Sequence, residues 1–294
     1  MRYADWVLVV GMAFGCAEAG RGQDAGPPGD GALPTDAPDA PDAPDAPRVA
    51  PLDRGAPPCV LTDPDDPCVG DAPTWPADLL SLVDWKLTLP VADPGDSASP
   101  WEIEQPDLAT FALEPWFDLA GDDGVRFAAN AGGVTTNGSS YPRSELREMR
   151  AAGTERAAWS TTDGVHTLTV TQAITHLPEV KPHVVAGQIH DAEDDVVMIR
   201  LEGTRLFVEA QGEDLGVLDP DYTLGDVFTA RFVAADGWID VYHQDLATPA
   251  VSYARATDGC YFKAGAYTQS NPDRGDAPDA YGAVEIRALT VTHE

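Results

Sequence analysis

The sequence predicts an all-β fold, a concanavalin-like jelly-roll sandwich of two stacked antiparallel sheets with one concave polar face, preceded by a Pro/Ala/Asp-rich tether. Three observations predict it. Short runs rich in Val, Leu, Ile, Thr, Phe and Tyr recur from about Trp75 to the C-terminus, Gly, Asp, Asn and Pro separate them, and long helical periodicity is scarce. Two stacked sheets, one of them concave and polar, form a jelly roll.

The first 16 residues have the pattern of a secretion signal. Arg2 precedes an apolar run from Trp6 to Phe14 that is too short to span a bilayer. Because the run ends at Gly15 and Cys16, it resembles a bacterial lipoprotein signal in which Cys16 would carry the lipid, although Phe14 stands where a small residue is usual. Cleavage by ordinary signal peptidase without a lipid is the alternative. We therefore expect a secreted protein or an outer-membrane or cell-surface lipoprotein of a bacterium.

Residues 17–72 are predicted to be a disordered linker. They are rich in Ala, Pro, Asp and Gly and contain four Asp-Ala-Pro repeats between residues 36 and 47, a composition that buries little apolar surface. Cys59 and Cys68 bracket eight residues, and a local disulfide between them would close that loop. Cys260 is then left as a buried free thiol. The folded domain is expected over residues 73–294.

The chain carries 18 basic and 49 acidic residues, a formal net charge of −31. This charge makes nucleic acid an improbable partner. Because Arg143, Arg147, Arg150 and Lys263 gather on neighbouring predicted strands, we expect a cationic cleft in an acidic body, which would hold an anionic ligand. No Cys-x-x-Cys pair or His-Cys cluster occurs, so no metal site is predicted.

Eleven strands are predicted from period-two patterns and turn residues. Thr204 after Gly203 and the segment 234–237 (AADG) predict two hairpins. The predicted strands cover residues 85–91, 125–130, 144–149, 166–175, 183–190, 196–203, 205–211, 228–235, 238–244, 260–267 and 284–293.

Polar side chains occupy alternate positions on three of these strands. Since residues i, i+2 and i+4 of a strand share one face, Arg143, Glu145 and Arg147 share a face, and Gln188 and His190 share another. In 261–269 (YFKAGAYTQ) the residues Tyr261, Lys263, Tyr267 and Gln269 lie together. Burying so many polar groups unpaired would be unfavourable, so the three strands predict one binding face.

These segments resemble a known family. RSELRE at 143–148, QIH at 188–190 and YFKAGAYTQ at 261–269 resemble the three signature segments of the alginate lyases of polysaccharide lyase family 7, and WKLTLPV at 85–91 resembles that family's first strand. The resemblance covers the chain from about residue 78 onward. It implies a β-jelly roll, a groove across the concave sheet, and cleavage of an anionic polysaccharide, alginate, by β-elimination without a cofactor or an obligatory metal.

The chemistry of elimination fits these residue types. Removing the C5 proton of a uronate requires neutralisation of its carboxylate, for which Arg143 offers a planar fork of donors and Gln188 further hydrogen bonds. His190 suits the base, because imidazole titrates near neutral pH. Tyr267 is the expected donor of the proton to the leaving O4, and the resemblance implies that it also serves as base when the C5 proton lies on its side.

Five residues are assigned to substrate binding, with alternatives for three. Lys263 and Gln269 are expected to bind neighbouring uronates. Arg147 either binds substrate or pairs with Glu145, and Glu145 more often orients the two guanidinium groups than takes part in catalysis. Tyr261 is either a stacking platform for sugar or a packing residue.

Two other functions stay open at this point. One is a lyase for another polyuronate, such as a glucuronan, and the other is a jelly-roll module that binds carbohydrate without cleaving it. Within the resembled family, Ile at the centre of QIH accompanies activity on guluronate, so Ile189 tilts the expected preference toward guluronate-containing blocks. We expect a monomer.

Overall fold

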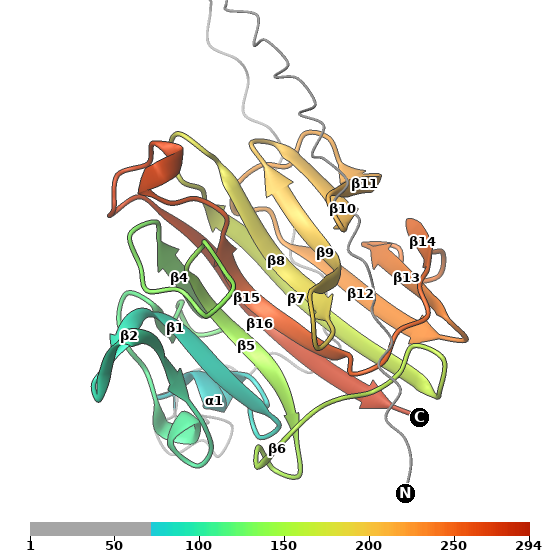
Figure 1. Ribbon diagram of the computed structural model, residues 1–294, viewed down its shortest axis with the longest axis horizontal. Coiled ribbons are helices and arrows are strands. Elements are labelled where there is room, and N and C mark those ends of the chain that lie inside the picture. Colours follow the sequence, from blue (N-terminus) through green and yellow to red (C-terminus); the bar gives the residue numbers. More distant parts are fainter. Residues whose placement is uncertain (1–71) are drawn as a thin grey trace, which may run out of the picture. The chain divides into compact units, whose positions relative to one another are not determined.

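Two antiparallel sheets pack face to face in the computed structural model, which describes residues 72–294 (Figure 1). The nine-stranded sheet has the order β11-β10-β9-β8-β15-β5-β1-β2, with β6 paired to β5. Its strands are β1 (Trp85–Asp93), β2 (Asp96–Ile103), β5 (Arg143–Arg150), β6 (Glu155–Arg156), β8 (His183–His190), β9 (Asp195–Glu202), β10 (Arg205–Ala210), β11 (Glu213–Asp219) and β15 (Tyr261–Thr268).

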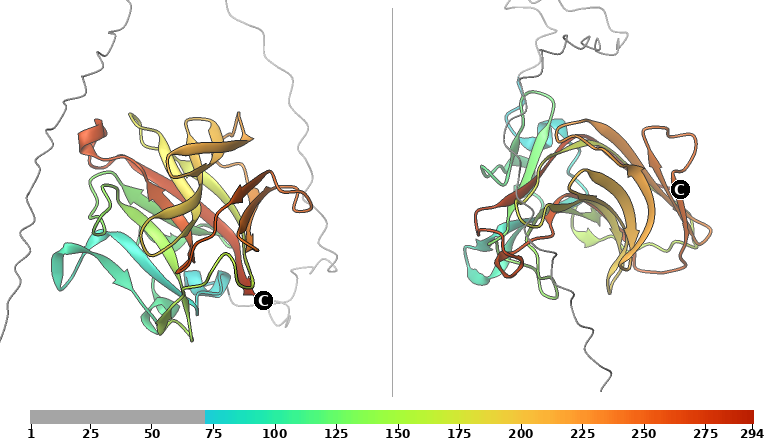
Figure 2. Two further views of the ribbon diagram at one scale, coloured as in Figure 1. Left: turned by 45° about the vertical axis from the view of Figure 1, so that its right-hand side comes forward. Right: turned by 90° about the horizontal axis from the view of Figure 1, so that it is seen from above.

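The seven-stranded sheet has the order β14-β13-β12-β7-β16-β4-β3. Figure 2 shows the two sheets as nested curved layers. The strands of the second sheet are β3 (Phe117–Leu119), β4 (Val125–Asn130), β7 (Val165–His176), β12 (Phe228–Ala235), β13 (Trp238–His243), β14 (Val251–Ala254) and β16 (Tyr281–His293), and the short helices are α1 (Pro76–Leu79), η1 (Asp107–Thr110) and η2 (Pro272–Arg274).

The core lies between the two sheets and is built by the alternate residues that face away from the groove. Leu146, Ile189 and Phe262 from the first sheet, and Leu168 and Phe232 from the second, are fully buried. Burying side chains of this size contributes about 1.5–3 kcal/mol each. The alternation therefore fixes which residues of the same strands are left to face the groove.

The all-β sandwich predicted from the sequence is confirmed. Three predicted strands, at 125–130, 183–190 and 228–235, have the observed bounds. Both hairpins are present: Gly203 begins the turn between β9 and β10, and Asp236 and Gly237, both with positive φ, form the turn between β12 and β13. The prediction missed five strands, β2, β3, β6, β11 and β14.

A bulge interrupts the central strand β15. The register between β15 and β8 shifts between Ala264 and Tyr267, and Gly265 adopts φ +136°. A Cβ atom at Gly265 would lie 2.5 Å from the backbone oxygen of Ser144. Only glycine fits there, so β15 approaches β5 closely in the middle of the sheet.

Cys260 is a buried free thiol, as predicted, and burial raises its pKa to about 12. Within residues 72–294 no helix is long and apolar enough to cross a membrane. The predicted signal at 1–16, the lipidation at Cys16 and the disulfide between Cys59 and Cys68 lie outside the described residues.

Candidate active site

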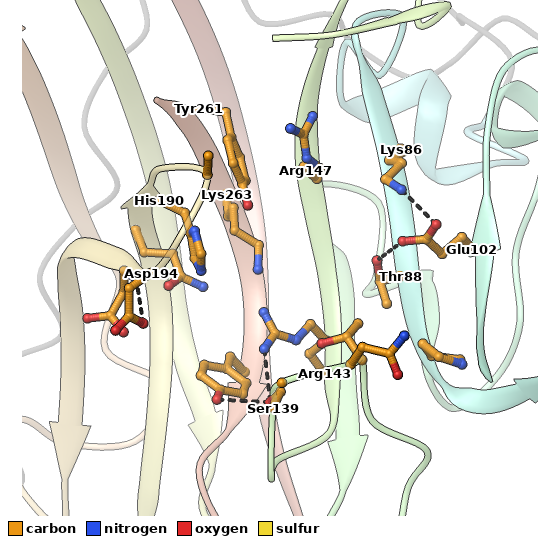
Figure 3. Close-up of a pocket in the computed structure, with 18 of the residues that line it drawn as sticks. Lys86, Thr88, Glu102, Ser139, Arg143, Arg147, His190, Asp194, Tyr261 and Lys263 are labelled. Carbon is orange, nitrogen blue, oxygen red and sulfur yellow. Dashed lines mark hydrogen bonds and ion pairs between the residues drawn. The ribbon is translucent and has the colours of Figure 1, made fainter. Parts of the chain in front are cut away.

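A groove with a volume of about 670 Å³ crosses the nine-stranded sheet (Figure 3). Its floor comes from β5, β8 and β15, and one wall comes from β1 and β2. Two loops complete it, one at residues 136–139 and one at residues 192–195. The three strands that the sequence singled out as one face thus meet in one groove.

Strand pairing places the side chains of this floor beside one another. Strand β15 lies between β5 and β8, so Lys263 is the register partner of both Arg147 and Gln188. Tyr267 lies opposite Arg143 on β5. Directly paired residues of antiparallel strands have Cβ atoms about 4.5–5.5 Å apart, which brings the cations of β5 and β15 within contact distance.

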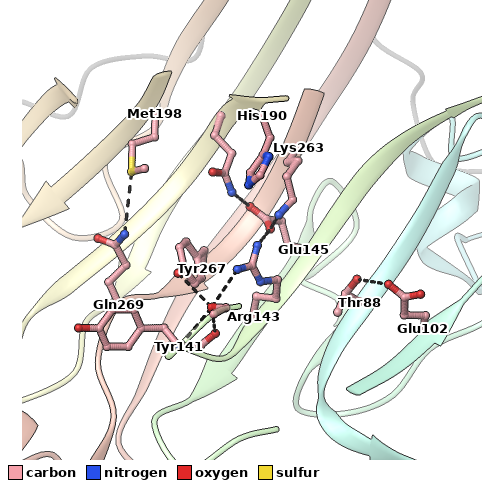
Figure 4. Close-up of polar contacts among 12 residues, drawn as sticks. Thr88, Glu102, Tyr141, Arg143, Glu145, His190, Met198, Lys263, Tyr267 and Gln269 are labelled. Carbon is pink, nitrogen blue, oxygen red and sulfur yellow. Dashed lines mark hydrogen bonds and ion pairs between the residues drawn. The ribbon is translucent and has the colours of Figure 1, made fainter. Parts of the chain in front are cut away.

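Glu145 is the centre of a buried ionic network below this floor (Figure 4). Its carboxylate accepts hydrogen bonds from Arg143 Nη1 at 2.9 Å, Lys263 Nζ at 2.6 Å and Gln188 Nε2 at 2.6 Å. The side chain is 1% exposed and is absent from the residues that line the groove, so Glu145 supports the groove cations from below, contrary to its assignment as a binding residue. Arg143 and Lys263 keep the pKa of Glu145 below its ordinary value despite burial.

Arg147 does not pair with Glu145. Its Nη1 donates to the backbone oxygen of Glu148 at 2.7 Å, and its guanidinium lies 3.8 Å from the centroid of the Tyr261 ring. The loop after β6 supplies a further acceptor, the backbone oxygen of Ala157 at 3.5 Å. The tertiary structure brings this loop against Arg147, and the local Arg-x-Glu-x-Arg pattern contains no sign of it. The pattern therefore suggested Glu145 as the partner of Arg147.

Lys263 is almost fully buried beside two guanidinium groups. Burial is the main cause that lowers its pKa, to about 8, while Glu145 raises it and Arg143 lowers it further. At neutral pH Lys263 is therefore protonated, but it loses its proton at a pH about two units lower than a free lysine does.

His190 presents one ring nitrogen to the groove. Its Nδ1 lies 2.7 Å from the backbone oxygen of Asp191. Since a carbonyl only accepts, Nδ1 carries the proton in the neutral ring and Nε2 has the free lone pair. Burial, followed by the charges of Lys263 and Arg143, lowers the pKa of His190. The hydrogen bond to the backbone of Asp191 acts in the opposite direction and raises it. The ring stacks on Tyr261 with centroids 5.4 Å apart.

Tyr267 lies under the guanidinium of Arg143, 4.0 Å from the ring centroid. Burial raises the pKa of the phenol, while the charge of Arg143 and a hydrogen bond with Ser139 oppose the rise. The phenol is thus protonated at neutral pH and can act as an acid.

One cation that the sequence assigned to the cleft, Arg150, and one amide, Gln269, do not line it. Arg150 is exposed and pairs with Glu155 outside the groove. Gln269 follows the end of β15, and its Nε2 lies 3.9 Å from Met198 Sδ, away from the groove-lining residues. β15 ends at Thr268, so Gln269 lies beyond the strand whose alternation placed it on the groove face.

Several groove residues carry no signal in the sequence. Ser139 lies in a loop without periodicity, and Asp194 lies in the acidic connection before β9, whose first residue is Asp195. A run of acidic residues of this kind is typical of solvated surface. Burial, followed by the charge of Asp194, raises the pKa of Asp195 to about 6. On the opposite wall Lys86 forms an ion pair with Glu102 at 2.7 Å.

Behind the groove, Glu148 fixes the start of β15. Its Oε2 accepts from the backbone N–H of Phe262 at 2.8 Å and from Trp159 Nε1 at 3.0 Å, and its Oε1 lies 2.7 Å from His293 Nε2. The carboxylate therefore joins β5, β15 and β16. Among residues 72–294 no group of three or more His, Cys, Asp or Glu side chains is arranged to hold a metal ion.

One open groove of the curved β-sandwich carries cations, a carboxamide, an imidazole and a phenol, an arrangement that fits an extended anionic chain. The comparisons identify the protein as a polysaccharide lyase. The family model described as alginate lyase matches residues 80–293. The chain therefore belongs to the alginate lyase family.

Solved structures and a characterised relative agree. Alginate lyase AlgAT5 from polysaccharide lyase family 7 is 53% identical with a TM-score of 0.71, over 75% of this chain and 99% of that one. The alginate lyase from Corynebacterium sp. is 47% identical with a TM-score of 0.70, over 75% and 98%. An alginate lyase of Klebsiella pneumoniae is 25% identical over 74% of this chain and 91% of its own length.

Proposed function

We propose that this chain is an exported lyase that cleaves the 1,4-glycosidic bonds of alginate by β-elimination and leaves 4,5-unsaturated uronate ends. The observation that carries the proposal is the presence of Arg143, Gln188, His190 and Tyr267 along one groove. The similar proteins are alginate lyases, and the family 7 lyase A1-II′, 25% identical with a TM-score of 0.65, was solved in complex with the product GGG.

Neutralisation of the substrate carboxylate comes first. Arg143 is held by Glu145 through Nη1, and Gln188 by the same carboxylate through Nε2. Both groups are therefore fixed before substrate arrives, and such preorganised donors stabilise the charge that develops in the enolate-like intermediate. The pair acts on the carboxylate attached to C5.

Proton removal is assigned to His190. Its Nε2 lone pair faces the groove because Nδ1 is held by Asp191. The lowered pKa of His190 keeps the ring neutral at pH 7, which is the form a base needs. Tyr267, protonated at that pH, then gives its proton to O4 as the C4–O4 bond breaks.

Binding of the neighbouring sugars is assigned to Lys263, Arg147 and Tyr261, which line the groove beside His190. A preference for guluronate-containing blocks is the finer part of the proposal. The complex of A1-II′ with GGG supports it. Ile189 is fully buried, so any influence on preference would act through the packing of β8 and not through contact with sugar.

The test is the near-ultraviolet absorbance of the conjugated product, followed separately with poly-mannuronate, poly-guluronate and glucuronan in the presence of chelator. We expect the fastest rise on poly-guluronate or mixed alginate blocks. Tyr267→Phe should bind oligosaccharide and turn over at least about 100-fold more slowly. A rise on glucuronan alone would show that alginate is not the substrate. An active Tyr267→Phe would show that Tyr267 is not the acid.

Export and attachment through Cys16 are tested apart from catalysis. In a bacterial host, metabolic labelling with a fatty acid should mark the wild-type chain and not Cys16→Ala. Loss of residues 1–15 with no label on either chain would instead indicate a secreted protein cleaved by ordinary signal peptidase.

A further inference from the structure

Ser139 contacts both the proposed acid and the proposed neutralising cation. It lies between β4 and β5, and its Oγ is 3.2 Å from the phenol oxygen of Tyr267 and 3.2 Å from Arg143 Nη2 (Figure 3). Two further bonds hold the hydroxyl to the backbone of Tyr141, 3.0 Å to its carbonyl oxygen and 3.2 Å to its nitrogen.

The number of protons on these groups restricts how they bond. A hydroxyl has one hydrogen and two acceptor lone pairs. Arg143 and the backbone N–H of Tyr141 can only donate, so they occupy the acceptor side of Ser139. The single hydrogen of Ser139 then has two acceptors to choose between, the carbonyl oxygen of Tyr141 and the phenol oxygen of Tyr267.

The charge of Tyr267 decides that choice. A protonated phenol is a weak acceptor, so the hydrogen of Ser139 is directed to the carbonyl of Tyr141. A phenolate is a much stronger acceptor, and the hydrogen then turns to Tyr267. Donation from the Arg143 guanidinium polarises the hydroxyl and strengthens it as a donor in this second arrangement.

We propose that Ser139 is a positioning residue of the elimination, which turns its hydroxyl hydrogen onto the Tyr267 oxygen as that oxygen loses its proton to the leaving group. The inference rests on the proposed function, in which Tyr267 is the acid. The C5 proton passes to His190, the C4=C5 bond forms as the C4–O4 bond breaks, and O4 takes the proton of Tyr267. Ser139 changes its bonding partner and neither gains nor loses a proton.

The balance of effects on Tyr267 agrees with this role. Burial alone raises the pKa of the phenol, and the hydrogen bond of Ser139 is one of the two main influences that lower it, after the charge of Arg143. Without Ser139 the Tyr267 phenolate would keep the nearby guanidinium of Arg143 but lose one hydrogen bond, so the pKa of the phenol would be higher.

The kinetic test compares three variants. Ser139→Ala removes the donor, Ser139→Thr keeps it, and Ser140→Ala is the matched control, because the bond from Asn271 Nδ2 to residue 140 uses only the backbone carbonyl. We expect Ser139→Ala to lower kcat on alginate by about 10- to 100-fold, the range for a hydrogen bond to a charged group. KM should change by less than about twofold, and Ser139→Thr and Ser140→Ala should keep most of the activity.

A second readout separates this role from a structural one. With ¹³C-labelled tyrosine, the signal of Tyr267, assigned by its loss in Tyr267→Phe, should titrate at higher pH in Ser139→Ala than in the wild type. The alkaline limb of kcat should move upward with it. An unchanged titration and pH profile, with or without a fall in kcat, would overturn the inference.

Failure of the proposed function gives a different result. If Tyr267→Phe keeps full activity, Tyr267 is not the acid, and the proposed mechanism fails whatever Ser139→Ala does. If Tyr267→Phe is inactive while Ser139→Ala matches Ser140→Ala in kcat, the mechanism stands and the role of Ser139 is refuted. Ser139→Cys, whose thiol is a weak donor, repeats the comparison should Ser139→Ala melt early.

Discussion

The buried carboxylate of Glu145 allows a prediction that links stability to pH. Glu145→Gln would leave Arg143 and Lys263 facing each other below the groove floor without a counter-charge. Breaking a buried ion pair in this way typically costs 3–5 kcal/mol. Lys263 can reduce the loss by releasing its proton, because its pKa in the intact network is only about 8.

The magnitude follows from that pKa. Burial holds the pKa of Lys263 below its value in the unfolded chain, so the charged lysine opposes folding, and wild-type stability rises by about 1.4 kcal/mol between pH 7 and pH 9 as the folded state releases this proton. In Glu145→Gln the carboxylate that raises the pKa of Lys263 is gone, so this pKa falls further. Once it lies below 7, the folded variant holds no proton on Lys263 at either pH, and its stability rises by about 2.7 kcal/mol over the same range. The destabilisation should therefore be about 1.4 kcal/mol larger at pH 7 than at pH 9.

Denaturant unfolding at the two pH values measures this difference. In melting temperature it corresponds to roughly 3–6 °C for a domain of this size. Glu155→Gln is the matched control, because Glu155 pairs with Arg150 at 2.7 Å on the exposed surface, where such pairs contribute about 0–1 kcal/mol. A Glu145→Gln effect that is equal at pH 7 and pH 9 would refute the assignment of Lys263 as its protonated partner.

Three further predictions concern the groove and its support. Because the carboxyl of Asp195 has a pKa of about 6, it is neutral below that pH and repels a polyuronate above it, so between pH 5 and pH 7 KM should rise severalfold more in the wild type than in Asp195→Asn. Over this range Lys263, with a pKa of about 8, keeps its charge. Glu148→Ala leaves the buried donors of Phe262 and Trp159 unpaired and should lower the free energy of unfolding by about 3 kcal/mol or more in denaturant titrations; a loss below 1 kcal/mol would contradict this. Gly265→Ala should abolish folding or activity, since its Cβ meets Ser144, whereas Gly212→Ala, with open space around it, should lower the melting temperature by only a few degrees.

Period-two alternation made the central strands predictable. β12 buries every second residue and β8 buries its six inner residues in a row, so the bounds of both could be inferred from their apolar positions. The missed strands lack that signal because they lie at sheet edges or are very short. β2 (DSASPWEI) is mostly exposed and contains a proline, and β11 (EDLGVLD) is half-exposed and contains a glycine. A strand with no buried face has no pattern to detect.

The same physics limits what could be predicted of the site. Alternation correctly placed Arg143, Gln188, His190 and Tyr267 toward one groove, because it depends only on the strand. It could not distinguish a side chain on the floor from one beneath it, as with Glu145. Nor could it show that a loop supplies Ser139, because partners from irregular segments are set by tertiary structure.

One electrostatic field serves both proton transfers in the proposed mechanism. Arg143 neutralises the substrate carboxylate and Lys263 binds a neighbouring uronate, and the same two charges add to burial in lowering the pKa of His190, so that the base is unprotonated when substrate binds. Arg143 also lowers the pKa of the Tyr267 phenol and eases departure of its proton. An acidic protein with a net charge of −31 can bind a polyanion in this way, because the surface charge is screened within about 8 Å at physiological salt. The groove cations act at contact distance, where screening by salt is small.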